Sequence, residues 1–100
     1  KCQVCGVAIP TKNGFYSEGA HIKPLGKPHN GDDSLANLIC LCPNHHAQFD
    51  AFSFYIDSSS LEIKGLSEFK GKKLLISKNH KINRDFFDYH RKLYDAAQKL

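Results

Sequence analysis

Four potential metal ligands occur in two pairs with the same short spacing. Cys2 and Cys5 form a C-x2-C pair. Cys42 and His45 form a C-x2-H pair. Structural zinc sites favour this tight spacing and use four protein ligands that leave no open coordination position. We therefore predict one structural Zn²⁺ site, which would indicate a reducing, intracellular setting. The alternative is a secreted domain with disulfides, because four cysteines allow three pairings.

The second histidine of the His45-His46 doublet points to a different site. Pro43 suits the first turn of a helix, where its missing N–H would have no partner, and a helix is predicted over 43–50. Adjacent residues on a helix point about 100° apart, so His46 faces away from the site of His45. His46 and Asp50 lie four residues apart on one face and offer nitrogen and oxygen ligands to Mg²⁺ or Mn²⁺. A surface pair joined by a hydrogen bond is the alternative.

His21 is a candidate general base. Hydrolytic reactions use a base to deprotonate water, and a nearby cation can stabilise the negative charge that develops. An imidazole, with an ordinary pKa near ~6.5, is a natural base at neutral pH. His21 is the last residue but one of the segment "FYSEGAHI" (15–22), which is predicted to be a strand with a bulge or close approach at Gly19. A buried strand histidine without chemistry is the alternative.

The elements that would position these residues come in the order strand, strand, helix. After the strand at 15–22, two Pro, two Gly and an Asn-Gly dipeptide predict a loop over 23–33. A buried second strand is predicted over 35–41, directly before the helix at 43–50. This arrangement would bring His21 near the ligands on the helix.

The remainder of the chain is predicted to support this unit. A hairpin is expected from 52–57 and 61–66, and a further strand from 72–77. Asn83 is a good N-cap for a last helix that runs to Leu100. The fold class is therefore α+β.

Two residues are expected to be buried without a chemical role. Cys40 and Cys42 are separated by one residue, a spacing that fits zinc poorly. We therefore interpret Cys40 as a buried apolar residue of the core. His90 falls on the apolar face of the last helix and is expected to pack in the core.

Length and charge set further limits. One hundred residues predict one small domain with a marginal hydrophobic core. Stabilisation of such a domain by a structural metal ion is a reasonable expectation. The net charge of +4 is a mild basic bias that is compatible with nucleic acid. No apolar run approaches the ~20 residues of a membrane span. The chain starts at Lys1 and contains no Met, so we expect it to be part of a longer polypeptide.

The order of the motifs resembles the HNH nucleases, whose domain is the ββα-metal finger. The resemblance covers about residues 2–57. The matching residues are Glu18, Ala20, His21, Ile22, Asn37, Leu38, Leu41, Cys42, Pro43, His45, His46, Phe49 and Asp50. The segment "GKKLLISKNHKINRDFFDYHRKL" is similar, more loosely, to the tail of HNH domains in modification-dependent restriction enzymes.

The resemblance implies a fold and an activity. The fold would be a zinc-stapled ββα-metal finger (about 2–57) with an extra hairpin, supporting strands and a C-terminal helix (about 58–100), all in one domain. The activity would be metal-dependent cleavage of DNA that leaves 5′-phosphate and 3′-hydroxyl ends, as the cleavage domain of a restriction-type enzyme.

The resemblance also implies roles for single residues. His21 would be the general base, Asn37 would hold the loop and orient His21, and His46 with Asp50 would bind the catalytic divalent ion. Many HNH enzymes carry a metal-binding Asp directly before the catalytic histidine, where this chain has Ala20. Strand alternation places Glu18 on the same face as Ala20, so Glu18 is expected to complete the divalent site.

DNA is the expected partner. Lys23 and Lys27 follow His21 in the loop and are the best candidates for phosphate contacts. Target recognition is expected to lie in an upstream DNA-reading domain of the full chain or in a homodimer partner, and the setting is expected to be the cytoplasm of a bacterium. The rival hypothesis is a non-catalytic zinc module that binds nucleic acid or protein. Such a module would need the zinc ligands but has no use for His21, Asn37, His46 and Asp50 together.

Overall fold

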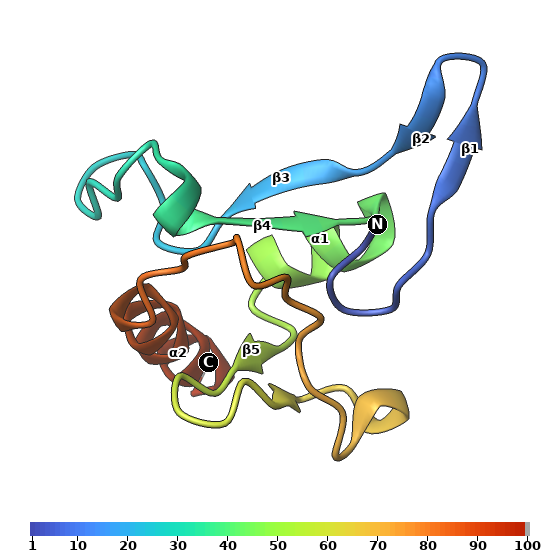
Figure 1. Cartoon of the computed structure of the whole chain (residues 1–100). Coiled ribbons are helices and arrows are strands. Elements are labelled where there is room, and N and C mark those ends of the chain that lie inside the picture. The colour runs from blue at the N-terminus through green and yellow to red at the C-terminus, as the bar shows by residue number, and fades with distance from the viewer. Residues whose placement is uncertain (100) are drawn as a thin grey trace.

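The computed structural model describes residues 1–99, in which three two-stranded antiparallel sheets combine with two α-helices (Figure 1). The strands are β1 (Ile9–Thr11), β2 (Gly14–Tyr16), β3 (Glu18–His21), β4 (Leu38–Leu41), β5 (Tyr55–Ile56) and β6 (Ile63–Lys64). The helices are the 3-10 turns η1 (Leu35–Asn37) and η2 (Ser67–Phe69) and the α-helices α1 (Pro43–Asp50) and α2 (Asp85–Gln98). The predicted α+β class, with its extra hairpin and C-terminal helix, is confirmed.

The ββα unit consists of β3, β4 and α1. β3 pairs with β4 in antiparallel register, with His21 opposite Leu38 and Glu18 opposite Leu41. α1 follows β4 after Cys42 alone, so it packs back against both strands (Figure 1). The predicted helix over 43–50 is confirmed, including its start at Pro43.

The predicted strand over 15–22 is divided in two. It breaks at Ser17, because β2 pairs with β1 whereas β3 pairs with β4. The β1–β2 hairpin projects from the body of the domain (Figure 1). This hairpin was not predicted, although the Asn13-Gly14 dipeptide is a hairpin signal and Gly14 has a φ of 116°.

The predicted strand over 35–41 is shorter than expected. Residues 35–37 form η1 instead, in which the N–H of Asn37 donates to the carbonyl of Ser34. This turn carries the Asn37 side chain, which is fully buried, into the interior. Strand structure begins at Leu38, where pairing with β3 begins.

The predicted strand over 72–77 is wrong. Its backbone groups are shared among separate partners: Leu74 N–H donates to the Leu61 carbonyl and Leu75 N–H donates to the Gln3 carbonyl. Within residues 1–99, this segment forms one isolated bridge and pairs with no neighbouring strand. The hairpin expected from 52–57 and 61–66 is present, with its paired strands limited to β5 and β6.

One hydrophobic cluster joins the ββα unit to the C-terminal half of the chain. Its buried members come from both parts of the sequence: Cys2, Val4, Ala20, Ile22, Ile39, Leu41, Cys42, Phe49, Phe54, Ile56, Leu61, Ile63, Leu74 and Phe87. The residue that anchors α2 in this cluster, Phe87, is fully buried. The supporting segments therefore stabilise the ββα unit by covering its apolar side.

α2 begins at Asp85 with Arg84 as its N-cap, one residue later than the predicted cap Asn83, and the Arg84 side chain makes no capping hydrogen bond. The Asn83 carboxamide oxygen accepts a hydrogen bond from the backbone N–H of Asp85 at 3.0 Å, which is the contact expected of a capping asparagine. The helix is described to Gln98, and the predicted end at Leu100 lies outside the described residues. None of the helices formed by residues 1–99 has the length and apolar character needed to cross a membrane.

His90 is buried in the core, as predicted. Only 2% of it is exposed. Its ring stacks on Phe49 with centroids 3.8 Å apart, and its Nε2 donates to the Phe49 carbonyl at 3.1 Å. Burial lowers the pKa of His90 to about 4, since a charged imidazolium would lose its hydration there.

Acidification should therefore destabilise the domain through His90. The imidazole of an unfolded chain binds a proton near pH ~6.5, whereas folded His90 does so only near pH 4. Between these values the unfolded state binds more protons than the folded state. The free energy of unfolding should therefore decrease as the pH is lowered, by about 3 kcal/mol in total. Urea unfolding from pH 7 to pH 4 measures this fall.

The matched variant for this measurement is His90→Gln, which retains an amide donor towards Phe49 and does not titrate. Acid also weakens metal binding by thiolates, but that effect is common to both proteins. The difference between the two pH profiles therefore isolates His90. Parallel profiles would contradict the prediction.

Candidate functional site

The four predicted zinc ligands come together in one cluster. One ligand atom from each of Cys2, Cys5, Cys42 and His45 lies within 4.8 Å of all the others. The Nδ1 atom of His45 is 3.2 Å from the sulfur of Cys42 and 3.8 Å from that of Cys2. Three thiols and one imidazole are a donor set of structural zinc sites, so the residues present fit this ion.

Local backbone structure positions the first two ligands, Cys2 and Cys5. The turn after Cys2 closes through a hydrogen bond from the Gly6 N–H to the Cys2 carbonyl, and Gly6 has a φ of 77°, which glycine adopts readily. Burial opposes ionisation of Cys2, but hydrogen bonds from the backbone of Cys5, Cys42 and Val4 outweigh it and lower the pKa of Cys2 to about 6. Burial and the neighbouring thiolates raise the pKa of Cys5 to about 11. Metal binding must therefore displace a proton from Cys5.

Cys40 is exposed, which corrects its predicted burial. Side chains alternate along β4, so Ile39 and Leu41 face the core and Cys40 faces outwards. Its backbone N–H donates to the side-chain oxygen of Gln3 at 2.7 Å, which ties β4 to the Cys2–Cys5 turn. Cys40 is outside the metal-ligand cluster, as the spacing predicts.

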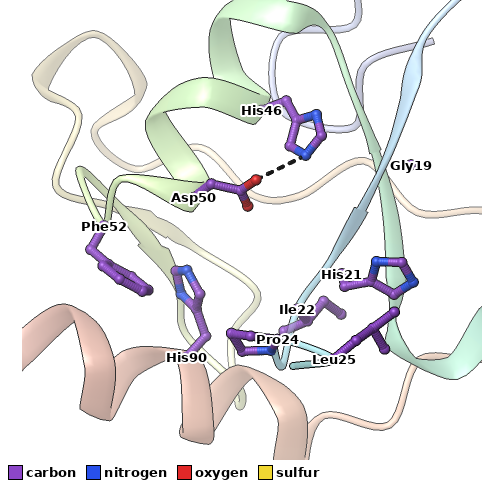
Figure 2. A pocket seen from close by; sticks show the side chains of 9 residues that line it. All are labelled: Gly19, His21, Ile22, Pro24, Leu25, His46, Asp50, Phe52 and His90. Atoms are coloured by element: carbon purple, nitrogen blue, oxygen red, sulfur yellow. Dashed lines mark ion pairs between the residues drawn. The ribbon is translucent and has the colours of Figure 1, made fainter. Parts of the chain in front are cut away.

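His46 makes contacts through both of its ring nitrogens. Its Nε2 lies 3.1 Å from an oxygen of Asp50, and its Nδ1 lies 2.9 Å from an oxygen of Glu18 (Figure 2 shows the Asp50 contact). The two carboxylates therefore approach the ring from different sides. Within residues 1–99, only the Cys/His cluster brings three potential ligand atoms within 4.8 Å of one another, so Glu18, His46 and Asp50 do not form such a group in this arrangement.

Glu18 is held on the Nδ1 side of His46. The hydroxyl of Tyr16 donates to the other oxygen of Glu18 at 2.6 Å. The hydrogen bond from Tyr16, followed by that from His46, lowers the pKa of Glu18. A charged carboxylate in this position orients the imidazole and leaves Nε2 facing Asp50.

A cleft of about 430 Å³ is lined by three of the predicted site residues, His21, His46 and Asp50 (Figure 2). It is lined by Gly19, His21, Ile22, Pro24, Leu25, His46, Asp50, Phe52 and His90. His21 comes from β3, and His46 and Asp50 come from α1. Glu18 is not among the lining residues.

His21 has a partner that the sequence did not indicate. Its Nε2 lies 3.1 Å from an oxygen of Asp33, which is at the far end of the loop. The side chain of His21 is 30% exposed and that of Asp33 is 79% exposed. No spacing rule predicts this pair, because a loop of this length can place its two ends in many ways.

Asn37 stabilises the loop that follows His21 and does not line the cleft. Its side-chain oxygen accepts from the Lys23 N–H at 2.8 Å. Its amide nitrogen donates to the carbonyls of Lys23 and Asp32, at 2.9 and 2.8 Å. These contacts are those expected of a residue that holds the loop after His21.

The two loop lysines are in different environments. Lys23 is half-buried, and its ammonium group lies over the ring of Tyr89, 4.6 Å from the ring centroid. Lys27 is exposed. His29 also contacts Tyr89, with 2.6 Å between its Nδ1 and the phenol oxygen, so the loop is attached to α2.

Family comparison agrees with this geometry. The HNH endonuclease family matches residues 2–57, which is more than half of the chain, and the chain belongs to this family. Among solved structures, it is similar to the modification-dependent TagI restriction endonuclease, with 41% identical residues and a TM-score of 0.81 over 93% of this chain. The match covers 33% of the TagI chain, so this chain spans about a third of that enzyme's length. A comparison with curated proteins gave no match.

Proposed function

We propose that this chain is a metal-dependent DNA endonuclease domain that hydrolyses phosphodiester bonds and serves as the cleavage domain of a restriction-type enzyme. One observation carries the proposal: His21 of β3 shares a cleft with the His46–Asp50 pair of α1 in a member of the HNH endonuclease family. A base and a site for a divalent cation are the two groups that this hydrolysis needs.

In the proposed reaction, His21 accepts a proton from the attacking water. Asn37 fixes the loop that follows His21 and does not itself touch the reacting atoms. The ammonium groups of the exposed Lys27 and of the half-buried Lys23 are the proposed phosphate contacts. The products would carry 5′-phosphate and 3′-hydroxyl ends.

The proposed divalent site consists of the Nε2 of His46 and the carboxylate of Asp50. An imidazole nitrogen and a carboxylate oxygen 3.1 Å apart are a donor pair that fits Mg²⁺ or Mn²⁺ with water and phosphate as further ligands. When bound, such an ion stabilises negative charge on the phosphate and on the departing 3′ oxygen. Glu18, which was expected to be a third ligand, is proposed to orient His46 through Nδ1.

The Cys/His cluster is proposed to hold Zn²⁺ for structure alone. Four protein ligands leave no position for water or substrate, so this ion would take no part in the chemistry. Its place at the start of α1 stabilises the helix that carries His46 and Asp50.

Recognition of the DNA target is proposed to lie outside this chain, in a DNA-reading domain or in a homodimer partner. The similar TagI enzyme is described as modification-dependent, and this chain corresponds to a third of it. The HNH endonuclease family matches residues 2–57 of this chain, so we propose that dependence on base modification would require a further domain.

Replacing His46 should remove activity and leave the fold intact. His46→Ala is expected to lower the rate of plasmid nicking in Mg²⁺ or Mn²⁺ at least about 100-fold, because the cation loses its nitrogen ligand. Zinc content and the thermal unfolding temperature should stay close to those of the wild type, since the ring lies outside the zinc cluster. Gln48→Ala, an exposed position on the same helix, is the matched control.

Two results would contradict this proposal. Equal nicking by the wild type and by His46→Ala would remove His46 from the active site. Absence of nicking by the zinc-loaded wild type in either metal, together with DNA or protein binding, would favour the non-catalytic zinc module.

A further inference from the structure

We propose that Asp33 is a positioning residue that orients His21 as the general base, an inference that rests on the proposed endonuclease function. The pair is formed by Nε2 of His21 and Oδ1 of Asp33, 3.1 Å apart. A carboxylate only accepts hydrogen bonds, so this contact assigns the ring proton to Nε2. Nδ1 then carries the lone pair that takes the proton of water.

The buried amide of Asn37 sets the geometry of this pair. It binds the N–H and carbonyl of Lys23, two residues after His21. It also binds the carbonyl of Asp32, the residue directly before Asp33. One fully buried side chain thus fixes the backbone on both sides of the His21–Asp33 contact. Asn37 would act on the base by bringing its carboxylate partner to it.

Further contacts keep the loop closed. The Gly31 N–H donates to the Pro24 carbonyl at 2.8 Å, and a Cβ atom at Gly31 would lie 2.2 Å from the Lys23 carbonyl oxygen. Only glycine allows this close approach of the two ends of the loop. On the outer side, Tyr89 of α2 contacts both His29 and Lys23. Asp33 therefore extends from a backbone that is held from two directions.

The charge of Asp33 is otherwise unfavourable at this position. A carboxylate beside the cleft repels the phosphates of DNA, so it weakens substrate binding. Its neighbour Asp32 is also an exposed aspartate, but the Asp32 side chain makes no hydrogen bond or ion pair within residues 1–99. The two acids therefore form a matched pair, in which only Asp33 contacts the base.

The test compares Asp33→Ala, Asp33→Asn and the control Asp32→Ala in the zinc-loaded chain. Asp33→Ala should lower kcat about 10- to 100-fold without raising KM, the size of effect found for carboxylates that orient metal-ligating histidines. Asp33→Asn retains an acceptor for Nε2–H and should lose no more than about 5-fold. Asp32→Ala should leave kcat unchanged.

A double-mutant cycle separates positioning from general structural damage. If Asp33 acts through His21, Asp33→Ala should have no further effect in a His21→Ala background. A structural role would lower residual cleavage in both backgrounds to the same extent, and this result would overturn the proposal. So would full kcat in Asp33→Ala, or equal losses in the Asn and Ala variants.

A measurement without DNA distinguishes this proposal from the proposed function. Three-bond NMR couplings should report one χ1 rotamer for His21 in the wild type and in Asp33→Asn, and averaging among rotamers in Asp33→Ala. If the wild type shows the fixed rotamer but does not cleave DNA, the endonuclease proposal fails and the His21–Asp33 contact is retained. If His21 has the same couplings in the wild type and in Asp33→Ala, the positioning proposal fails whatever the cleavage result.

Discussion

Cys42→Ala should yield a chain that binds no zinc and does not fold. The apparent free energy of binding structural zinc is roughly 10–16 kcal/mol at pH 7. The net stability of a folded domain is only about 5–15 kcal/mol. Cys42 both closes the ligand cluster and directly precedes α1, so its loss would release the Cys2–Cys5 turn from the ββα unit. His45→Ala should have the same effect.

The chain contains a matched control for this prediction. Cys40→Ala removes a thiol two residues earlier that is exposed and outside the cluster. Its effect on the free energy of unfolding should stay within about 0.5 kcal/mol, as for an ordinary surface position. Zinc per chain by elemental analysis and amide dispersion by NMR are the measurements. A Cys42→Ala protein that folds as stably as Cys40→Ala would show that the Cys/His cluster does not stabilise the fold.

The same samples test the disulfide alternative. All four cysteines are free in the structure. A thiol titration of the unfolded, unreduced protein should therefore find four free thiols and near one released zinc per chain. Two disulfides without metal would support the secreted-domain interpretation.

His21→Ala should lower plasmid cleavage by roughly 10³-fold, within the range that general base catalysis contributes. His21 lines the cleft together with His46 and Asp50, and no other histidine of the cleft is in a position to replace it, since His90 is buried with its Nε2 bound to Phe49. Zinc content should be unchanged. Single-turnover cleavage of supercoiled plasmid in Mg²⁺ or Mn²⁺ measures the effect.

His80→Ala is the control for the loss of one imidazole, because His80 lines no part of the cleft. Added imidazole should restore part of the activity of His21→Ala and none of that of His46→Ala, since a free base can replace a proton acceptor more readily than a held metal ligand. Equal nicking by His21→Ala and the wild type would remove His21 from the role of base.

Local features of the sequence were good predictors of the structure. α1 has its predicted bounds because Pro43 and the helical spacing of its residues act over a few positions. The Cys/His cluster was predicted because two short-spaced ligand pairs have few alternatives to a shared ion. The Asn83 capping contact was likewise predictable from its position directly before a helical pattern.

Features that depend on a distant partner were predicted poorly. The segment 72–77 has the composition of a strand but divides its hydrogen bonds between Leu61 and Gln3. Cys40 was expected to be buried, yet the pairing of β4 turns its side chain outwards. In each case the outcome depended on which other segment lies alongside, and composition does not contain that information.

The doublet His45-His46 shows what the sequence by itself determined. Helical geometry alone sends the two rings in different directions, and the structure places His45 in the Cys/His cluster and His46 beside Asp50. Only the tertiary structure decided on which side of His46 the expected ligand Glu18 lies and which group contacts His21. Glu18 lies at Nδ1 of His46, and Asp33 reaches His21 across a loop held by Asn37. The physical reason is that periodicity fixes neighbours within a helix, whereas contacts across a loop arise only when the whole chain packs.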